Sequence, residues 1–199
     1  MAAESNEKLM LNWFQMQTLK SLQAQQKTGM LERPLLLKMV EKAICRSFER
    51  ISDARNTSLF FDLDTHRLVL EFESADGSAQ KFAMDEMSDG YKNTLSMIGD
   101  IAYRMAVLNP TLGDQVLEKT PGVVLIDEID LHLHPQWQQT ILSDLHAIFP
   151  EIQLLSALMH QRLSTLFQES RSGFWIMEKF IYLQHRLMEE TLILYCVRL

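Results

Sequence analysis

The sequence predicts an α/β fold in which a helical segment and a small antiparallel meander precede part of a parallel sheet. Three observations predict this order. Apolar residues recur every three or four positions before residue 57, form three short strand-like runs between residues 58 and 86, and then make one continuous run at Val123–Ile126. A helical period, a strand period and a buried-strand pattern therefore follow one another along the chain.

Residues 1–57 are predicted to hold two packed amphipathic helices. The first runs from Leu9 to about Gln25 and is ended by Gly29, with an apolar face made by Leu9, Trp13, Met16, Leu19 and Leu22. The second begins after Pro34, and its apolar face consists of Leu36, Val40, Ala43, Ile44, Phe48 and Ile51. We expect these two faces to form the core of this segment.

Residues 58–86 are predicted to form an antiparallel meander. Strand-like runs occur at Leu59–Phe61, Leu68–Phe72 and Lys81–Ala83. The turn-prone stretches Asp64–His66 and Ala75–Ser78 separate these runs. Each strand is therefore expected to pair with the next one along the chain.

Residues 87–153 read as a helix followed by the start of a parallel sheet. A helix is expected from Tyr91 to Leu108, where Asn109-Pro110 stops it, and a polar linker leads to Gly122. Val123–Ile126 is then a strand buried on both faces. A helix from about Gln136 to Ile148 follows, with Pro135 in its first turn and Pro150 after its end.

Composition and charge narrow the function classes. The net charge of -7 gives no overall footprint for nucleic acid, although a local basic patch is compatible with a negative total, so nucleic-acid binding stays open. Cys45 and Cys196 form no disulfide framework or zinc motif. No apolar run reaches membrane-spanning length and the first residues lack a basic leader region. We expect a cytoplasmic protein without membrane contact.

The strand at Val123–Ile126 delivers two acids, Asp127 and Glu128, to the carboxyl edge of the predicted sheet. This is the Walker B arrangement, in which the first carboxylate holds the Mg²⁺ of a nucleotide and the second deprotonates an attacking water. Paired acids after a strand are also common by chance. Taken alone, the pair is equally compatible with a structural role.

A second element is the loop Met87-Ser88-Asp89-Gly90 directly before a helix. Ser88 and the backbone N–H groups of Asp89 and Gly90 would lie at a positive helix terminus, which attracts anions. Helix capping by Ser88 or Asp89 explains the residue types equally well at this one place. Capping does not explain why a Walker B strand follows downstream.

The whole order resembles ABC-class ATPases of the RecF, SMC and OLD type, over about residues 9–153. Its most specific part runs from Met87 through Val123-Val124-Leu125-Ile126-Asp127-Glu128 to the Leu133-His134-Pro135-Gln136-Trp137-Gln138 segment. That segment is typical of stand-alone bacterial AAA family ATPases, several of which belong to phage-defence systems such as Septu and retrons. The resemblance implies a partial ABC-ATPase-like P-loop NTPase fold with ATP and Mg²⁺ as cofactors.

The resemblance also implies roles for individual positions. Ser88, Asp89 and Gly90 match the signature loop, which touches the γ-phosphate of ATP held by the other protomer of a head-to-tail dimer. Asp127 matches the Mg²⁺ ligand and Glu128 the catalytic glutamate. His134 lies in the D-loop, Leu131–Pro135, where SMC-like members often have aspartate. The implied partner is a complete ATPase protomer or a missing N-terminal half.

The chain departs from the family in having no phosphate-binding loop. No G-x-x-x-x-G-K-[ST] segment occurs in the 199 residues. We therefore expect a truncated ABC-type ATPase, a gene remnant that is not catalytic alone. An alternative is a binding module that docks onto a complete ATPase protomer. A third interpretation is a metal-dependent hydrolase that uses Asp127, Asp130, His132 and His134.

The second departure lies in residues 154–199, a divergent tail. The family places a switch histidine six residues after the position of Gln153, but here that position is Met159 and the histidine is His160. We hypothesise a frameshift, since one added nucleotide in a suitable codon set after Gln153 restores Gln-Phe-Ile-Val-Ser-Thr-His-Ala-Pro. The alternative is a genuine tail in which Phe174–Leu194 forms an apolar helix on the sheet.

Reading the gene tests the frameshift. We expect a neighbouring frame after the Gln153 codon to encode a Thr-His-Ala-Pro-like string, because the family pattern would resume there. The measurement is the nucleotide sequence of this region. Codons that yield no such string in either neighbouring frame would exclude a frameshift and favour a genuine tail.

Overall fold

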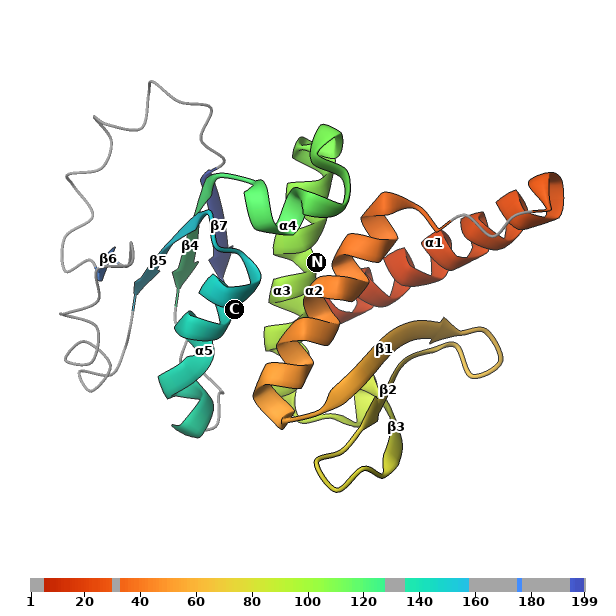
Figure 1. Ribbon diagram of the computed structural model, residues 1–199, viewed down its shortest axis with the longest axis horizontal. Coiled ribbons are helices and arrows are strands. Elements are labelled where there is room, and N and C mark those ends of the chain that lie inside the picture. Colours follow the sequence, from red (N-terminus) through yellow and green to blue (C-terminus); the bar gives the residue numbers. More distant parts are fainter. Residues whose placement is uncertain (1–5, 30–32, 128–134, 158–174, 177–193, 199) are drawn as a thin grey trace, which may run out of the picture. The chain divides into compact units, whose positions relative to one another are not determined.

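The computed structural model describes residues 6–29, 33–127, 135–157, 175–176 and 194–198 (Figure 1). These residues belong to two compact units, Met1–Leu117 and Glu118–Leu199. The first unit contains the long helices of residues 6–108 and the antiparallel meander, and the second contains the parallel sheet and the helix Pro135–Ile148. The predicted α/β class, with an antiparallel meander followed by a parallel sheet, is therefore confirmed.

The first unit begins with the two predicted helices, α1 (Asn6–Thr28) and α2 (Leu35–Ser52). Gly29 ends α1 with a φ of +72°, a left-handed conformation that glycine adopts without steric cost, and its N–H donates to the carbonyl of Gln25 at 2.8 Å. Helix α2 begins directly after Pro34. Both predicted helices are confirmed. Helix α1 ends at the predicted glycine, and α2 begins after the predicted proline.

The predicted apolar face of α1 is wrong. Phe14 is fully buried, whereas Leu9 and Met16 are each 53% exposed and Leu19 is 39% exposed. The ring of Trp13 contacts Phe14 edge-on at 5.0 Å and Tyr103 of the third helix at 5.5 Å. On this helix, apolar residues spaced three and four positions apart occur in two adjacent stripes. The stripe that contains Phe14 is the buried one. Periodicity alone does not decide between them.

Helix α2 packs closely against α3 (Asp89–Leu108). The buried side of α2 includes Val40, Ala43, Ile44 and Phe48, in agreement with most of its predicted face. The two helices come close together at Gly99 of α3, where an added Cβ would lie 3.1 Å from Cδ1 of Ile44. Gly99 therefore allows the two helices to approach within a distance that a larger side chain would not permit.

The predicted meander is confirmed as β1 (Arg55–Asp62), β2 (Arg67–Glu73) and β3 (Ala79–Ala83) in the antiparallel order β1-β2-β3. Leu59 pairs with Leu70, and Leu70 also pairs with Phe82 of β3. The edge of the Phe48 ring on α2 meets Phe72 of β2 with 4.8 Å between centroids. The meander is thereby packed against the helix that supports α3.

The prediction of a polar linker after Leu108 is wrong. Residues Pro110–Gln115 form a 3₁₀ segment, η2, and Val116–Lys119 form a short helix, α4. Val116 and Leu117 are fully buried. These two apolar side chains lie between polar neighbours, and their burial makes this segment part of the core rather than a solvated connection.

The second unit is built on a parallel sheet. Its strands are β4 (Gly122–Asp127), β5 (Ile152–Ala157), β6 (Trp175–Ile176) and β7 (Leu194–Arg198), in the order β6-β5-β4-β7 with every pair parallel. Val123, Val124 and Ile126 are buried. The predicted buried parallel strand is confirmed, and α5 (Pro135–Ile148) confirms the predicted helix.

The alternative helix over Phe174–Leu194 is wrong at the positions that the structure describes. Trp175–Ile176 is strand β6, and Leu194 begins strand β7, which pairs with β4. Residues 177–193 lie outside the described residues, as do Met159 and His160. The frameshift stays a prediction, because a strand through Leu154 is expected both in the present reading frame and in the shifted one.

Replacing Gly99 with leucine tests the contact between α2 and α3. We expect Gly99→Leu to lower the free energy of unfolding by about 1–3 kcal/mol, because the new side chain overpacks against Ile44. Asp100→Leu places the same residue on the partly exposed neighbouring position and is expected to change it by about 0.5 kcal/mol or less. Urea unfolding of both variants measures the difference, and equal stabilities would contradict the close packing.

Candidate functional site

The predicted signature residues lie together at the beginning of α3. Ser88 is the N-cap residue with φ −63° and ψ 155°, and Asp89 and Gly90 are the first two helical residues. The N–H of Lys92 donates to the carbonyl of Ser88 at 3.1 Å, but the Ser88 side chain makes no capping hydrogen bond. The Ser88 hydroxyl therefore does not cap the helix, and Ser88 is exposed.

The electrostatics of this helix terminus are mixed. Asp89 has an 87% exposed side chain whose carboxylate lies 3.3 Å from Nζ of Lys92. The positive end of a 20-residue helix attracts an anion, and the Lys92 ammonium partly offsets the Asp89 charge. Ser88 and Asp89 are exposed and Gly90 is buried, so the Ser88 hydroxyl and the Asp89 N–H are the groups that fit the phosphate end of a nucleotide.

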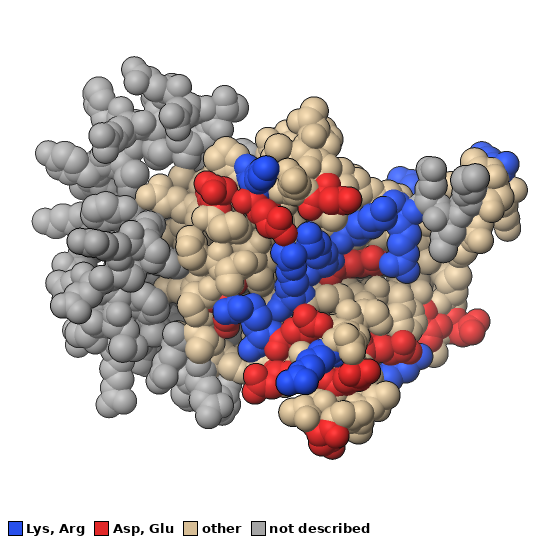
Figure 2. Space-filling model, in the orientation of Figure 1, with Lys and Arg blue, Asp and Glu red and all other residues tan. Residues whose placement is uncertain are grey.

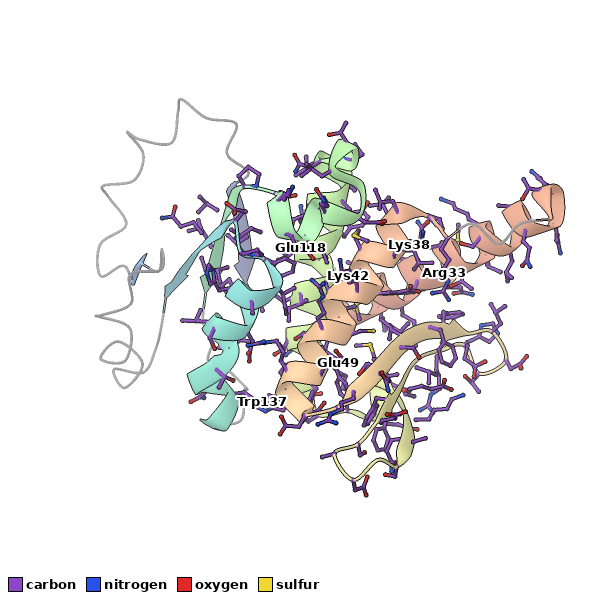
Figure 3. All side chains as sticks on the ribbon, viewed as in Figure 1. Arg33, Lys38, Lys42, Glu49, Glu118 and Trp137 are labelled. Atoms are coloured by element: carbon purple, nitrogen blue, oxygen red, sulfur yellow. The ribbon has the colours of Figure 1, made fainter. Side chains whose placement is uncertain are left out.

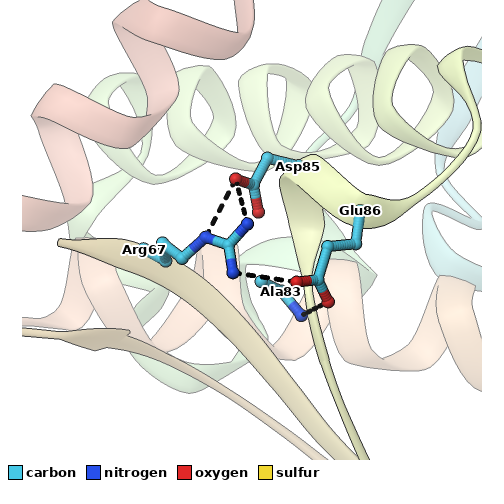
Figure 4. A network of polar contacts seen from close by, with 4 residues as sticks. All are labelled: Arg67, Ala83, Asp85 and Glu86. Carbon is cyan, nitrogen blue, oxygen red and sulfur yellow. Dashed lines mark hydrogen bonds and ion pairs between the residues drawn. The ribbon is translucent and has the colours of Figure 1, made fainter. Parts of the chain in front are cut away.

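An arginine clamp holds the turn that leads into this loop (Figure 4). Arg67, the first residue of β2, donates from Nε and Nη2 to Oδ2 of Asp85 at 2.9 and 2.7 Å and from Nη1 to Oε1 of Glu86 at 2.8 Å. The N–H of Ala83 donates to the other oxygen of Glu86 at 3.4 Å. The hydrogen bonds from Arg67 to Asp85 and Glu86 raise the pKa of its guanidinium, and Asp85 has the larger effect.

The clamp connects the meander to the signature loop. Asp85 and Glu86 belong to the 3₁₀ turn η1 (Met84–Glu86), which ends two residues before Ser88. Sequence reasoning missed Arg67 because its partners lie 18 and 19 residues away. The available signal was the acidic pair next to the loop, together with an arginine at the start of a predicted strand.

The first of the two predicted Walker B residues, Asp127, lies in the second unit. Asp127 is the last residue of β4, where its backbone pairs with Ala157 of β5 and Arg198 of β7. This position at the carboxyl edge of a central parallel strand agrees with the sequence prediction. Glu128, His134 and the rest of the D-loop before Pro135 lie outside the described residues.

The metal-hydrolase interpretation depends on residues that are not described. Asp130, His132 and His134 all fall within 128–134. Elsewhere, within the ranges that the structure describes, no group of three or more His, Cys, Asp or Glu residues could hold a metal ion. Within the same ranges, no helix combines the length and apolar character needed to cross a membrane.

Basic residues follow one side of α2. Lys38, Lys42, Arg46 and Arg50 are spaced four apart, and Figures 2 and 3 show Lys and Arg side chains beside acidic ones along this helix. Lys42, Arg46 and Arg50 each take part in an interaction with another residue. The net charge left a local basic patch open, and the structure has four basic residues along α2, three of which interact with other residues.

The antiparallel meander, the helix that follows it and the parallel sheet define this chain as an α/β protein with a partial P-loop ATPase fold. The family described as "AAA domain, putative AbiEii toxin, Type IV TA system" matches residues 31–162, which is more than half of the chain. The chain belongs to this family. The resemblance to bacterial AAA family ATPases is confirmed.

Individual relatives are retron and Septu proteins. The chain is 44% identical over 78 residues to the "Retron Vc95 probable ATPase" of Vibrio cholerae serotype O1 biovar El Tor, covering 39% of this chain and 15% of that protein. It is 41% identical over 81 residues to the Septu protein PtuA of Bacillus mycoides (strain KBAB4), covering 41% of this chain and 10% of PtuA. The matched parts thus span a small share of each relative's length.

Among solved structures, the Smc head domain with a coiled coil and joint from Pyrococcus yayanosii is similar to this chain. The TM-score is 0.42 and the identity 18%, and the match covers 69% of this chain and 26% of that chain. A similarity of this size supports no argument about function.

Removing the Arg67 side chain tests the clamp. We expect Arg67→Ala to speed amide hydrogen exchange at residues 84–90, because the η1 turn loses its connection to β2. Arg104→Ala removes a similarly exposed arginine, which pairs with Asp100 on α3, and should leave exchange at these residues unchanged. Exchange measured by mass spectrometry distinguishes the two variants. Equal rates at residues 84–90 in Arg67→Ala and the unaltered protein would show that the clamp does not hold the turn.

Proposed function

We propose that this chain supplies the signature loop and the Walker B carboxylates of an ABC-type ATP site. The observation that carries the proposal is the Ser88 hydroxyl at the N-terminus of α3, which makes no capping hydrogen bond. The chain belongs to an AAA family, and its strand β4 ends at Asp127. The family relationship supports ATP and Mg²⁺ as the cofactors of such a site.

Each residue has a distinct role in this proposal. Ser88 and the N–H groups of Asp89 and Gly90 bind the terminal phosphate at the helix N-terminus. Asp127 holds Mg²⁺, which neutralises phosphate charge when it is bound. Glu128 orients and deprotonates the attacking water, and His134 belongs to the D-loop at the interface with a second protomer.

We propose further that the chain is not catalytic by itself. The sequence has no phosphate-binding loop to cradle the β- and γ-phosphates, so most of the binding contacts for ATP must come from other polypeptide. The missing contacts come either from another part of a longer protein or from a second polypeptide. The names of the relatives support a setting in a retron or Septu system. We propose a cytoplasmic location.

A second candidate is a module that docks onto a complete ATPase protomer of the same family. It is favoured by the exposure of Ser88 and Asp89, which leaves the signature loop accessible to another polypeptide. In a head-to-tail dimer this loop would complete the site of the partner protomer.

Complementation tests the proposal. The chain is titrated into a complete homologous ATPase whose own signature serine is replaced by alanine, and phosphate release is measured. We expect the chain alone to release no phosphate and the mixture to regain activity. Ser88→Ala should reduce the regained rate by about tenfold or more, because a hydrogen bond to a charged phosphate is lost.

Ser58→Ala, an exposed serine of β1, is the matched control and should restore activity as well as the unaltered chain. Phosphate release by the chain alone would contradict the claim that other polypeptide must supply the phosphate-binding loop. Equal rescue by Ser88→Ala would contradict the role of the signature loop.

A further inference from the structure

The outer edge of strand β3 is open in the first unit. The three-stranded sheet has the order β1-β2-β3, so β3 has a neighbouring strand on one side only. Within the part of the chain that the structure describes, β2 is also the only element with which β3 makes extensive contact. The backbone N–H and C=O groups of such an edge are a template for a further strand.

The pairing of β3 with β2 shows which of its backbone groups are already used. The N–H of Ser74 donates to the carbonyl of Ser78 at 2.9 Å and continues the ladder of the two strands in the same register. In an antiparallel ladder, every second residue directs both its N–H and its C=O toward the partner strand. Ser78, Gln80 and Phe82 therefore bond toward β2.

The alternate residues Ala79, Lys81 and Ala83 direct their backbone groups away from β2. In agreement with this alternation, the N–H of Ala83 donates to the carboxylate of Glu86 at 3.4 Å, outside the sheet. Among the described residues, the N–H and C=O of Ala79 and Lys81 have no hydrogen-bond partner. Each of these two residues therefore offers one donor and one acceptor to an added strand.

The side chain of Lys81 does not guard this edge. Lysines on edge strands commonly discourage further pairing. Here Nζ of Lys81 lies 3.2 Å from a carboxylate oxygen of Glu71 on β2 and 5.2 Å from the ring centroid of Phe60 on β1. The side chain thus lies over its own sheet, and the outer backbone groups of β3 stay accessible.

An apolar surface adjoins the open edge on the other face of the sheet. Phe82, whose side chain alternates with that of Lys81, is 45% exposed, and its ring lies 5.7 Å from that of Phe72. Together with Phe48 and Tyr91, these two rings border an apolar hollow of about 320 Å³. A residue opposite Phe82 in an added strand would lie on this face, with about 5 Å between the Cβ atoms. An apolar side chain there would cover Phe82.

The charges around the edge favour a basic partner. Residues 67–86, from the start of β2 to the end of η1, include five acidic and two basic residues, a net charge of -3. Asp76 lies exposed before β3, and Asp85 and Glu86 follow its end, where they share Arg67. Lysine or arginine in the added strand would complement these carboxylates, whereas a second copy of this edge would bring like charge to it.

We propose that the open edge of β3 binds an extended segment of another polypeptide, which adds a fourth strand to the meander. The segment has apolar residues at alternate positions, on the face of Phe82, and basic residues at its ends. Its backbone bonds to Ala79 and Lys81. The proposal is based on the meander and does not depend on the proposed ATP site.

The probe for this surface is the acetylated and amidated peptide Lys-Thr-Val-Thr-Val-Thr-Lys. Fluorescence anisotropy of the labelled peptide follows its binding to the full 199-residue chain. We expect saturable binding, and binding at least about tenfold weaker when glutamate replaces the lysines, because the charges then repel. N-methylation of the threonine amides keeps the side chains but removes the donors to β3, and should also weaken binding by about tenfold or more.

Lys81→Pro tests the same edge from the side of the protein. Because the N–H of Lys81 faces away from β2, proline at this position removes an outward donor and leaves the β2–β3 ladder intact. Lys81→Ala is the matched control, since it removes the same side chain and keeps the N–H. We expect Lys81→Pro to bind the peptide about tenfold more weakly than Lys81→Ala does. The N-methylated peptide makes this comparison with the unaltered chain and so requires no variant to fold.

Amide exchange measured by NMR locates the added strand. In the free chain, the amides of Ala79 and Lys81 should exchange faster than those of Gln80 and Phe82, which bond to β2. The peptide should slow exchange at Ala79 and Lys81 by about tenfold or more, because their N–H groups become paired.

Any of the following results would overturn the proposal: no saturable peptide binding, equal binding of the N-methylated or the glutamate peptide, or equal affinities of Lys81→Pro and Lys81→Ala. Unchanged exchange at Ala79 and Lys81 would show that the peptide binds elsewhere. A peptide affinity that falls as the protein concentration rises would show that a second copy of the chain occupies the edge instead.

Discussion

The close packing of α2 on α3 at Gly99 is the contact on which the candidate site of the first unit depends. Without a side chain at Gly99, Ile44 and Val40 of α2 lie directly against the backbone of α3. Leu95, Ile98 and other apolar residues of α3 are then fully buried. The packing of α3 on α2 therefore sets where the N-terminus of α3, and hence Ser88, lies.

Two kinds of interaction act on the signature loop from the other side. The guanidinium of Arg67 fixes the turn η1 through charged hydrogen bonds, and the rings of Phe48 and Phe72 pack the meander against α2. The hydrogen bonds are exposed, so each contributes little to stability, whereas the edge-on ring contact also supplies apolar contact area. The loop is therefore positioned by polar contacts and supported by apolar ones.

The predicted signature loop lies where the meander meets α3, because Met87 and Ser88 connect η1 to the helix. The contacts of Arg67 with η1 therefore act two residues before the helix N-terminus. In the proposed function, this terminus binds the phosphate of a nucleotide whose other contacts come from further polypeptide.

The sequence by itself determined the order of elements, the antiparallel meander, the buried strand before Asp127 and the position of Ser88 at a helix terminus, because period, glycine and proline act locally. The roles of Glu128 and His134 stay predictions, since both lie outside the described residues. Only the tertiary structure decided that α1 buries Phe14 rather than Leu9, that Val116 and Leu117 are core residues, and that Arg67 reaches Asp85. Each of these depends on a partner distant in sequence, and no local pattern specifies which of two adjacent faces that partner covers.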